Sequence, residues 1–80
     1  MDTGDALRAM AARSGHSLAQ ASRLAGRSDR WIATAIAKGG TVGAATLADV
    51  AAPLGYALAL IPSDKVPAGA IVIDPPKPVE

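Results

Sequence analysis

The first part of the chain repeats apolar residues every three or four positions, which predicts a series of short helices. We expect helices over residues 5–14, 18–25, 29–38 and 44–54, each of them followed by a glycine. Glycine is favoured just after a helix because it adopts a positive φ without steric cost. The side chains expected to face inward share this spacing, and they are Leu7, Met10, Ala11, Leu18, Ala21, Ala25, Ile32, Ala35, Ile36, Leu47, Val50, Ala51 and Leu54.

The ends of these predicted helices carry further signals. Ser17 and Ser28 stand where an N-cap is needed, because a serine hydroxyl accepts a hydrogen bond from an amide in the first turn. Asp29 follows the second of these serines and suits the positive end of a helix dipole. Pro53 lacks an amide hydrogen, so we expect it in the last turn of the fourth helix, where it costs one hydrogen bond.

The repeat shortens to two residues after Gly55. YALALI predicts a strand over residues 56–61, and AIVID predicts a second strand over residues 70–74. The predicted organisation is a mainly α domain of four to five helices over residues 1–55, a strand or hairpin extension over 56–74, and a flexible Pro-rich tail over 75–80.

An unpaired strand with an apolar face favours pairing with a second copy. The residues expected at such a dimer interface are Tyr56, Leu58, Leu60, Ile71 and Ile73. The alternative is a hairpin within one chain, with the helices forming the dimer contact.

Composition limits how much core the chain can build. A chain of 80 residues forms one small domain, and nineteen of these residues are alanines, which contribute little burial each. Self-association is therefore expected as a source of extra burial. The chain has no cysteine, no signal-like first segment and no apolar run long enough to cross a bilayer, so we expect a cytoplasmic protein without membrane contact.

Charge is distributed unevenly although the net charge is only +1. Residues 6–48 hold six basic side chains and one acid, Asp29, which gives this segment a net charge of +5. The two flanking segments carry −2 each. This asymmetry favours an anionic partner for the helical part, although a plain solvated helical surface would show the same charges.

Two short helices joined by a glycine turn, with capping serines eleven residues apart, are typical of a helix-turn-helix. The stretch SLAQASRLAGRSDRWIATAIAKG resembles the helix-turn-helix of the phage repressor and Cro family, also named the xenobiotic-response-element family. The later segment TLADVAAPLG is similar to the fourth helix of that family, and GYALALIP is similar to the strand that antitoxin-like members add after it. The family pattern falls on Ser22, Gly26, Ser28 and Ile32. Ser22 replaces the usual alanine, and Arg27 replaces a usual valine or isoleucine, so we expect Arg27 to point outward.

The resemblance implies that the third helix lies in the major groove of DNA, with its first turn toward the bases. Arg30 is then the expected guanine reader, and Asp29 either accepts from cytosine or positions Arg30. Trp31 has two interpretations, as a cover for the edge of the core or as a contact to sugar and phosphate. Arg23 would add attraction that does not depend on sequence. The full set of expected DNA-binding residues is Ser17, Arg27, Ser28, Asp29, Arg30, Trp31, Ala33, Thr34, Ala37 and Lys38.

The sequence holds little that suggests catalysis. It has one histidine, His16, no phosphate-cradling glycine loop and no nucleophile motif, so we expect no enzyme activity, no cofactor and no metal site. Two function classes remain. One is a sequence-specific transcriptional regulator, a dimeric repressor that binds an inverted repeat in double-stranded DNA. The other is a protein-interaction module, such as an antitoxin that binds a toxin or another regulator through its C-terminal strand and tail.

Overall fold

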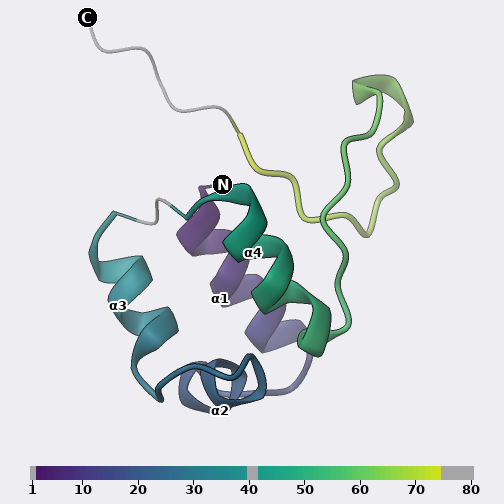
Figure 1. Ribbon diagram of the computed structural model, residues 1–80. Helices are drawn as coiled ribbons and strands as arrows, with labels where there is room; N and C mark the ends of the chain where they lie inside the picture. Colours follow the sequence, from purple (N-terminus) through teal and green to yellow (C-terminus); the bar gives the residue numbers. More distant parts are fainter. Residues whose placement is uncertain (1, 40–41, 75–80) are drawn as a thin grey trace, which may run out of the picture.

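The computed structural model describes residues 2–39 and 42–74. The protein is mainly α-helical (Figure 1). Its elements, in order, are the α-helices α1 (Thr3–Arg13), α2 (Leu18–Leu24), α3 (Trp31–Ala37) and α4 (Ala44–Ala51), followed by the 3₁₀ turns η1 (Ala52–Leu54) and η2 (Ser63–Lys65). The mainly α class predicted from the spacing of apolar residues is confirmed, with helix bounds that differ from the predicted ones by up to three residues.

α1 begins two residues earlier than expected because of a cap that the apolar pattern does not show. The Asp2 carboxylate accepts from the backbone amide of Asp5 at 2.8 Å, and the Asp5 carboxylate accepts from the amide of Asp2 at 3.3 Å. This reciprocal pair is a capping box, which satisfies two amides that have no partner within the helix. The start of α1 also holds the chain ahead of α4, since the Thr3 hydroxyl accepts from the amide of Val42 at 3.2 Å.

The turn after α2 depends on one glycine. Gly26 has a φ of +73°, a conformation that residues with a Cβ rarely adopt. This conformation lets the amides of Gly26 and Arg27 donate back to the carbonyls of Arg23 and Ser22, each at 2.9 Å. The pair of bonds is a Schellman motif, which ends α2 and directs the chain toward α3.

The core lies where α1, α3 and α4 meet above α2, as the arrangement of ribbons in Figure 1 shows. Each helix supplies the residues that its apolar spacing predicted: the buried cluster is Leu7, Met10, Ala11, Ala21, Ile32, Leu47, Val50, Ala51 and Leu54. Leu18, Ala25, Ala35 and Ile36 are partly buried against it. The predicted inward faces are therefore confirmed, with these four residues at the margin of the core.

α4 ends before the proline that was expected inside it. The helix stops at Ala51, and Pro53 lies in the 3₁₀ turn η1, which ends at Gly55 with a φ of +84°. The missing amide hydrogen of proline explains the change, since a tighter turn loses fewer bonds than an interrupted α-helix. Leu54 still reaches the core from this turn.

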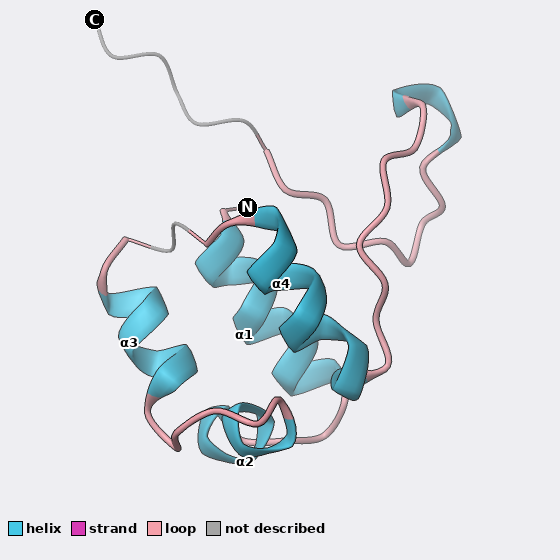
Figure 2. Cartoon of the chain, viewed as in Figure 1, coloured by secondary structure: helices cyan, strands magenta, loops and turns pink. Residues whose placement is uncertain are grey.

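The strands predicted over residues 56–61 and 70–74 are not found, because the described part of the chain contains helices and loops alone (Figure 2). We name residues 56–74 the C-terminal arm. The arm leaves η1, turns at η2 and returns past α1, and the Arg13 guanidinium donates to the Gly69 carbonyl at 3.1 Å where it returns. A strand needs a partner for its amides and carbonyls, and an isolated two-stranded pair is marginal in water, so alternating apolar residues do not suffice. The predicted flexible tail over residues 75–80 lies outside the described residues.

Candidate nucleic-acid interface

α3 has one face in the core and one face in solvent. Ile32 is fully buried, while Ala33, Thr34 and Ala37 are exposed on the other side. Lys38, the C-cap residue, is also exposed. This is the division that the sequence predicted for a helix whose outer face meets DNA. The exposed face carries small side chains, so another molecule can approach the α3 backbone closely.

The start of α3 differs from the prediction. The helix begins at Trp31 with Arg30 as its N-cap, so Ser28 is not the cap and Asp29 is not in the first turn. Residues 28–31 instead form a turn in which the Trp31 amide donates to the Ser28 carbonyl at 3.0 Å. No side chain of this turn makes a cap hydrogen bond to α3. Asp29 and Arg30 are both exposed on this turn, at the N-terminal end of α3.

The missing cap is supplied from α2. The hydroxyl oxygen of Ser22 accepts from the backbone amide of Ile32 at 3.1 Å and donates to the Leu18 carbonyl at 2.8 Å. Ser22 is fully buried, and it is the one buried polar side chain in the described ranges. Sequence reasoning noted this serine as a departure from the family pattern but did not predict its role. The available signal was a polar residue at an inward position of a short helix.

The sequence suggested that Arg27 points away from the domain, and this prediction is wrong. Its guanidinium carbon lies 4.9 Å from the centroid of the Trp31 ring, which is a cation–π contact. Its Nη2 atom lies 3.0 Å from Oδ2 of Asp49 on α4. Arg27 therefore connects the turn after α2 to the first residue of α3 and to α4.

Asp29 also forms an ion pair within the domain. Its Oδ2 atom lies 3.3 Å from Nη1 of Arg23 on α2, and both side chains are more than half exposed. Exposed pairs of this kind contribute little net stability, because water screens the charges and ordering two side chains costs entropy. The pair can therefore exchange for other charged partners at small cost.

Two further cations, Arg30 and Lys38, lie on this surface. Across residues 2–39 and 42–74, neither Arg30 nor Lys38 forms an ion pair, and both are exposed. They lie at opposite ends of α3. Asp49 lies one residue beyond the segment for which a charge of +5 was counted, and including this partner of Arg27 gives residues 6–49 a net charge of +4. The excess of positive charge at α3 is thus carried by two side chains rather than spread evenly.

Ser17 fills the structural role expected of it. Its hydroxyl accepts from the Gln20 amide at 3.1 Å, and the Gln20 side chain accepts from the Ser17 amide at 2.9 Å. This capping box begins α2. A contact between Ser17 and a phosphate stays a prediction.

Trp31 packs against the core while keeping part of its surface in solvent. This placement matches the interpretation that it covers the edge of an alanine-rich core. The Arg27 guanidinium lies over this ring. Large aromatic rings dominate burial in small cores, so Trp31 joins α3 to the domain through its ring. A DNA contact by its indole stays a prediction.

The residues predicted for a dimer interface divide into two groups. Tyr56 and Ile71 pack against the core of their own chain. Leu58, Leu60 and Ile73 are exposed, and Leu60 has the greatest exposure, 103% of the reference value. Three further apolar side chains of the C-terminal arm are exposed, and they are Ile61, Val66 and Val72.

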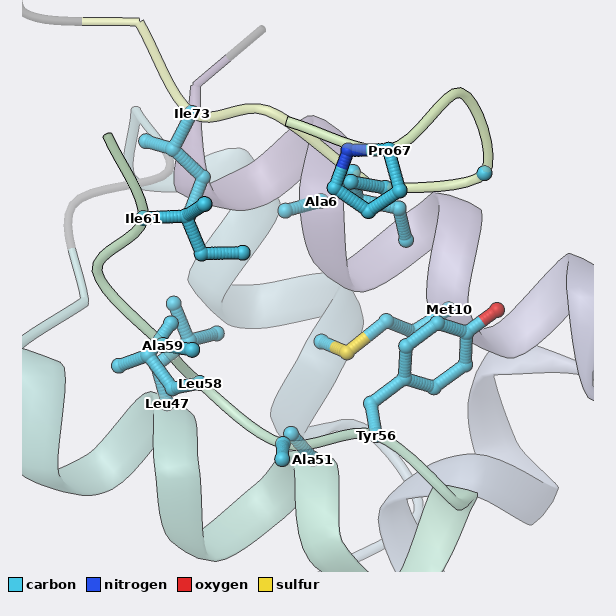
Figure 3. Close-up of a pocket in the computed structure, with 14 residues that line it drawn as sticks. Ala6, Met10, Leu47, Ala51, Tyr56, Leu58, Ala59, Ile61, Pro67 and Ile73 are labelled. Atoms are coloured by element: carbon cyan, nitrogen blue, oxygen red, sulfur yellow. The ribbon is translucent and has the colours of Figure 1, made fainter. Parts of the chain in front are cut away.

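An apolar pocket of about 320 Å³ lies between the C-terminal arm and the helices (Figure 3). Met10 on α1 and Leu47 on α4 line it on the side of the helices, and Tyr56, Ile61 and Ile73 line it from the arm. Among the described residues that line it, Tyr56 alone carries an ionisable group. The arm thus leaves apolar surface open both in this pocket and on its outer side.

No group of three or more His, Cys, Asp or Glu side chains gathers closely enough to hold a metal ion in the described ranges. None of the helices in these ranges combines the length and the apolar character needed to span a bilayer.

The chain was compared with protein-family models, with curated proteins and with solved structures, and none of the three comparisons found a match. The arrangement of residues around α3 and the C-terminal arm is therefore what a functional proposal has to rest on.

Proposed function

We propose that this protein is a sequence-specific, double-stranded DNA-binding transcriptional regulator, acting as a dimeric repressor, in which α2 and α3 form a repressor-like helix-turn-helix. The observation that carries the proposal is the division of α3. Its inner face is fixed in the core by Ile32, and its outer face combines small side chains with a cation at each end that forms no ion pair with the described residues. This combination suits the major groove, which admits one α-helix and is bordered by phosphates.

In this proposal the two ends of α3 have different roles. Arg30 stands at the N-terminal end of the helix, and its planar fork can donate to both acceptors on a guanine edge. Thr34 and the methyl groups of Ala33 and Ala37 face the same side and can meet a thymine methyl. Lys38 lies at the other end, where its ammonium reaches a phosphate rather than a base.

α2 contributes contacts to the phosphate backbone. Arg23 is held by Asp29 in the free protein, and the exposed pair can open when a phosphate competes for the guanidinium. Asp29 would then be free to accept from a cytosine amino group or to orient Arg30. The backbone at Ser17 lies at the start of α2, which is a position that favours an anion.

Dimer formation is proposed through the C-terminal arm. Six large apolar side chains of the arm are exposed in a single chain, and residues 56–61 have no ladder partner within residues 2–39 and 42–74. A second copy related by a two-fold axis would cover the apolar side chains and could supply the missing strand partner. Such an axis would place two α3 helices on successive turns of DNA, roughly 34 Å apart, which matches an inverted repeat.

The proposal is tested by selecting bound duplexes from a random pool and measuring affinity for the winner over a range of salt concentrations. We expect an enriched inverted repeat and an affinity that falls steeply with salt, because Lys and Arg displace counterions from phosphate. A scrambled duplex of the same length is the control for specificity. A pool from which no sequence is enriched, or an affinity that is flat with salt, would contradict the proposal.

A second candidate function is a protein-interaction module of the antitoxin kind. The exposed apolar side chains of the arm and the pocket beside Met10 favour it, since patches of this sort mark protein contacts. The two functions are compatible in one molecule, with α3 on DNA and the arm on a protein. A monomer with an intact fold that selects no DNA would favour the interaction module alone.

A further inference from the structure

A backbone hydrogen bond fixes the position of Arg27 independently of the contacts of its side chain. Its amide donates to the Ser22 carbonyl at 2.9 Å, as the last bond of the Schellman motif that ends α2. Gly26, with its positive φ, permits this bond. The turn therefore holds the backbone of Arg27 where its side chain can reach the start of α3.

The side chain of Arg27 then contacts two elements that are far apart in sequence. It lies over the ring of Trp31, the first residue of α3, and pairs with Asp49 on α4. The Arg27 side chain is 31% exposed and that of Asp49 is 70% exposed. The guanidinium is thus the more enclosed partner, held between an aromatic face and a carboxylate. Arginine suits this place because its planar group can stack on a ring and donate a directional hydrogen bond to a carboxylate at the same time.

The start of α3 needs such contacts because the helix is short and has no cap of its own. α3 has seven residues, and its N-cap residue makes no side-chain hydrogen bond. Two contacts from outside hold its first turn: Ser22 binds the Ile32 amide, and Arg27 covers the ring of Trp31. The first fixes the position of the helix end. The second resists rotation of the helix about its axis, because it acts on a side chain that extends from that axis.

We propose that Arg27 is a positioning residue that sets the orientation of α3, and with it the direction in which Arg30 meets the bases, rather than a ligand of phosphate. This role rests on the proposed DNA-binding function. It replaces the expectation that Arg27 contacts DNA directly. Asp49 is the second part of the device, since it holds the guanidinium over Trp31.

Replacing Asp49 separates this role from simple electrostatics, because the two make different predictions for the ratio of specific to nonspecific affinity. Asp49→Asn removes a negative charge beside the proposed DNA surface, which by charge alone would tighten binding to every sequence alike. If Arg27 is a positioning residue, the ratio of specific to nonspecific affinity falls instead, by roughly two- to fivefold, a change in keeping with the ordinary strength of a cation–π contact. Asp64→Asn is the matched control, since Asp64 is exposed in η2 and forms no ion pair with the described residues.

Arg27→Lys provides the second arm of the test. Lysine keeps the positive charge but lacks the planar group that stacks on the ring. A phosphate ligand would tolerate this change, whereas a positioning residue loses the same two- to fivefold in the affinity ratio, with the salt dependence unchanged. Trp31 is the chain's one tryptophan, so its fluorescence reports the contact in the free protein. We expect its emission to shift in Arg27→Lys and Asp49→Asn and to stay constant in Asp64→Asn.

The outcomes keep the two proposals apart. If the wild-type protein enriches no sequence from a random pool, the proposed function is overturned. If it does enrich one, but the affinity ratio or the Trp31 emission is the same in Asp49→Asn as in the wild type, the positioning role is overturned while DNA binding stands. An Arg27→Lys variant with a wild-type ratio overturns the positioning role equally.

Discussion

The buried hydroxyl of Ser22 on α2 accepts a hydrogen bond from the backbone amide of Ile32 on α3, with an oxygen to nitrogen distance of 3.1 Å. The amide belongs to the first turn of α3, where helical amides have no partner within their own helix. α2 therefore caps α3 through the Ser22 side chain as well as packing against it. The bond explains how a seven-residue helix starts without a capping residue of its own.

Ser22→Ala should lower the free energy of unfolding by about 1–3 kcal/mol, because it leaves the buried Ile32 amide without a partner. Ser14→Ala is the matched control. The Ser14 hydroxyl donates to the Met10 and Ala11 carbonyls, which also accept from backbone amides, and it accepts from no amide of the described residues. We expect that variant to stay within about 0.5 kcal/mol of the wild type. Urea titration measures both, and equal losses would show that the Ser22 hydroxyl is not a cap.

Gly26→Ala should destabilise the protein by about 1–2 kcal/mol through backbone strain alone. Gly26 has a positive φ, yet a Cβ added there would meet no atom within 4 Å. Gly69→Ala is the control, because Gly69 has equal space and no positive φ. Thermal unfolding followed by circular dichroism compares the two. A Gly26→Ala variant as stable as Gly69→Ala would contradict the strained-turn explanation.

Arg30→Ala and Lys38→Ala should have different effects on DNA binding. Losing Arg30 should cost roughly 1–3 kcal/mol on the selected site and relax preference at one base pair. Losing Lys38 should weaken binding to all sequences alike and reduce the salt slope by about one. Each variant removes one cation at one end of α3, and neither cation forms an ion pair with the described residues, so each variant serves as the control for the other. Unchanged specificity in Arg30→Ala would show that this end of α3 does not read bases.

Leu60→Asp should raise the dissociation constant of the proposed dimer at least about tenfold, since each copy loses the burial of one leucine. The Leu60 side chain is fully exposed in the single chain, so the fold itself should not be affected. Ser63→Asp adds the same charge to the same arm at an exposed polar position and is the control. Sedimentation measures the dissociation constant. A wild-type protein that is monomeric at micromolar concentration and still binds its full site tightly would remove the dimer from the proposal.

Leu58→Pro tests whether the dimer uses a strand. Proline removes an amide donor in the middle of residues 56–61 and leaves the helical sequence unchanged. We expect a monomer that keeps its helical circular dichroism and binds a full inverted repeat poorly. A Leu58→Pro variant that still dimerises would favour contact through the helices instead.

The spacing of apolar residues determined which side of each helix is buried. Ile32 and Val50 are in the core because a period of 3.6 residues places them on the face that the other apolar residues share. The turn at Gly26 after α2 could also be predicted from the sequence, since few residues other than glycine take the required φ. These features depend on neighbours within a few residues along the chain. A pattern in the sequence can therefore predict them.

Other features were decided by contacts between distant segments. Ser28 has the right type and position for an N-cap, yet Ser22 supplies the cap because packing brings α2 beside the start of α3. Arg27 was expected in solvent, and only the fold shows that Asp49 and Trp31 lie within its reach.

The C-terminal arm shows the same limit. The alternation in YALALI indicates a strand, but a strand exists only where another segment takes its hydrogen bonds, and no described segment of this chain does so. Local sequence thus determined the helices and their buried faces, because those depend on short-range geometry. Tertiary structure decided the partners of Ser22, Arg27 and the arm, because a hydrogen bond or ion pair depends on distances that sequence separation does not specify.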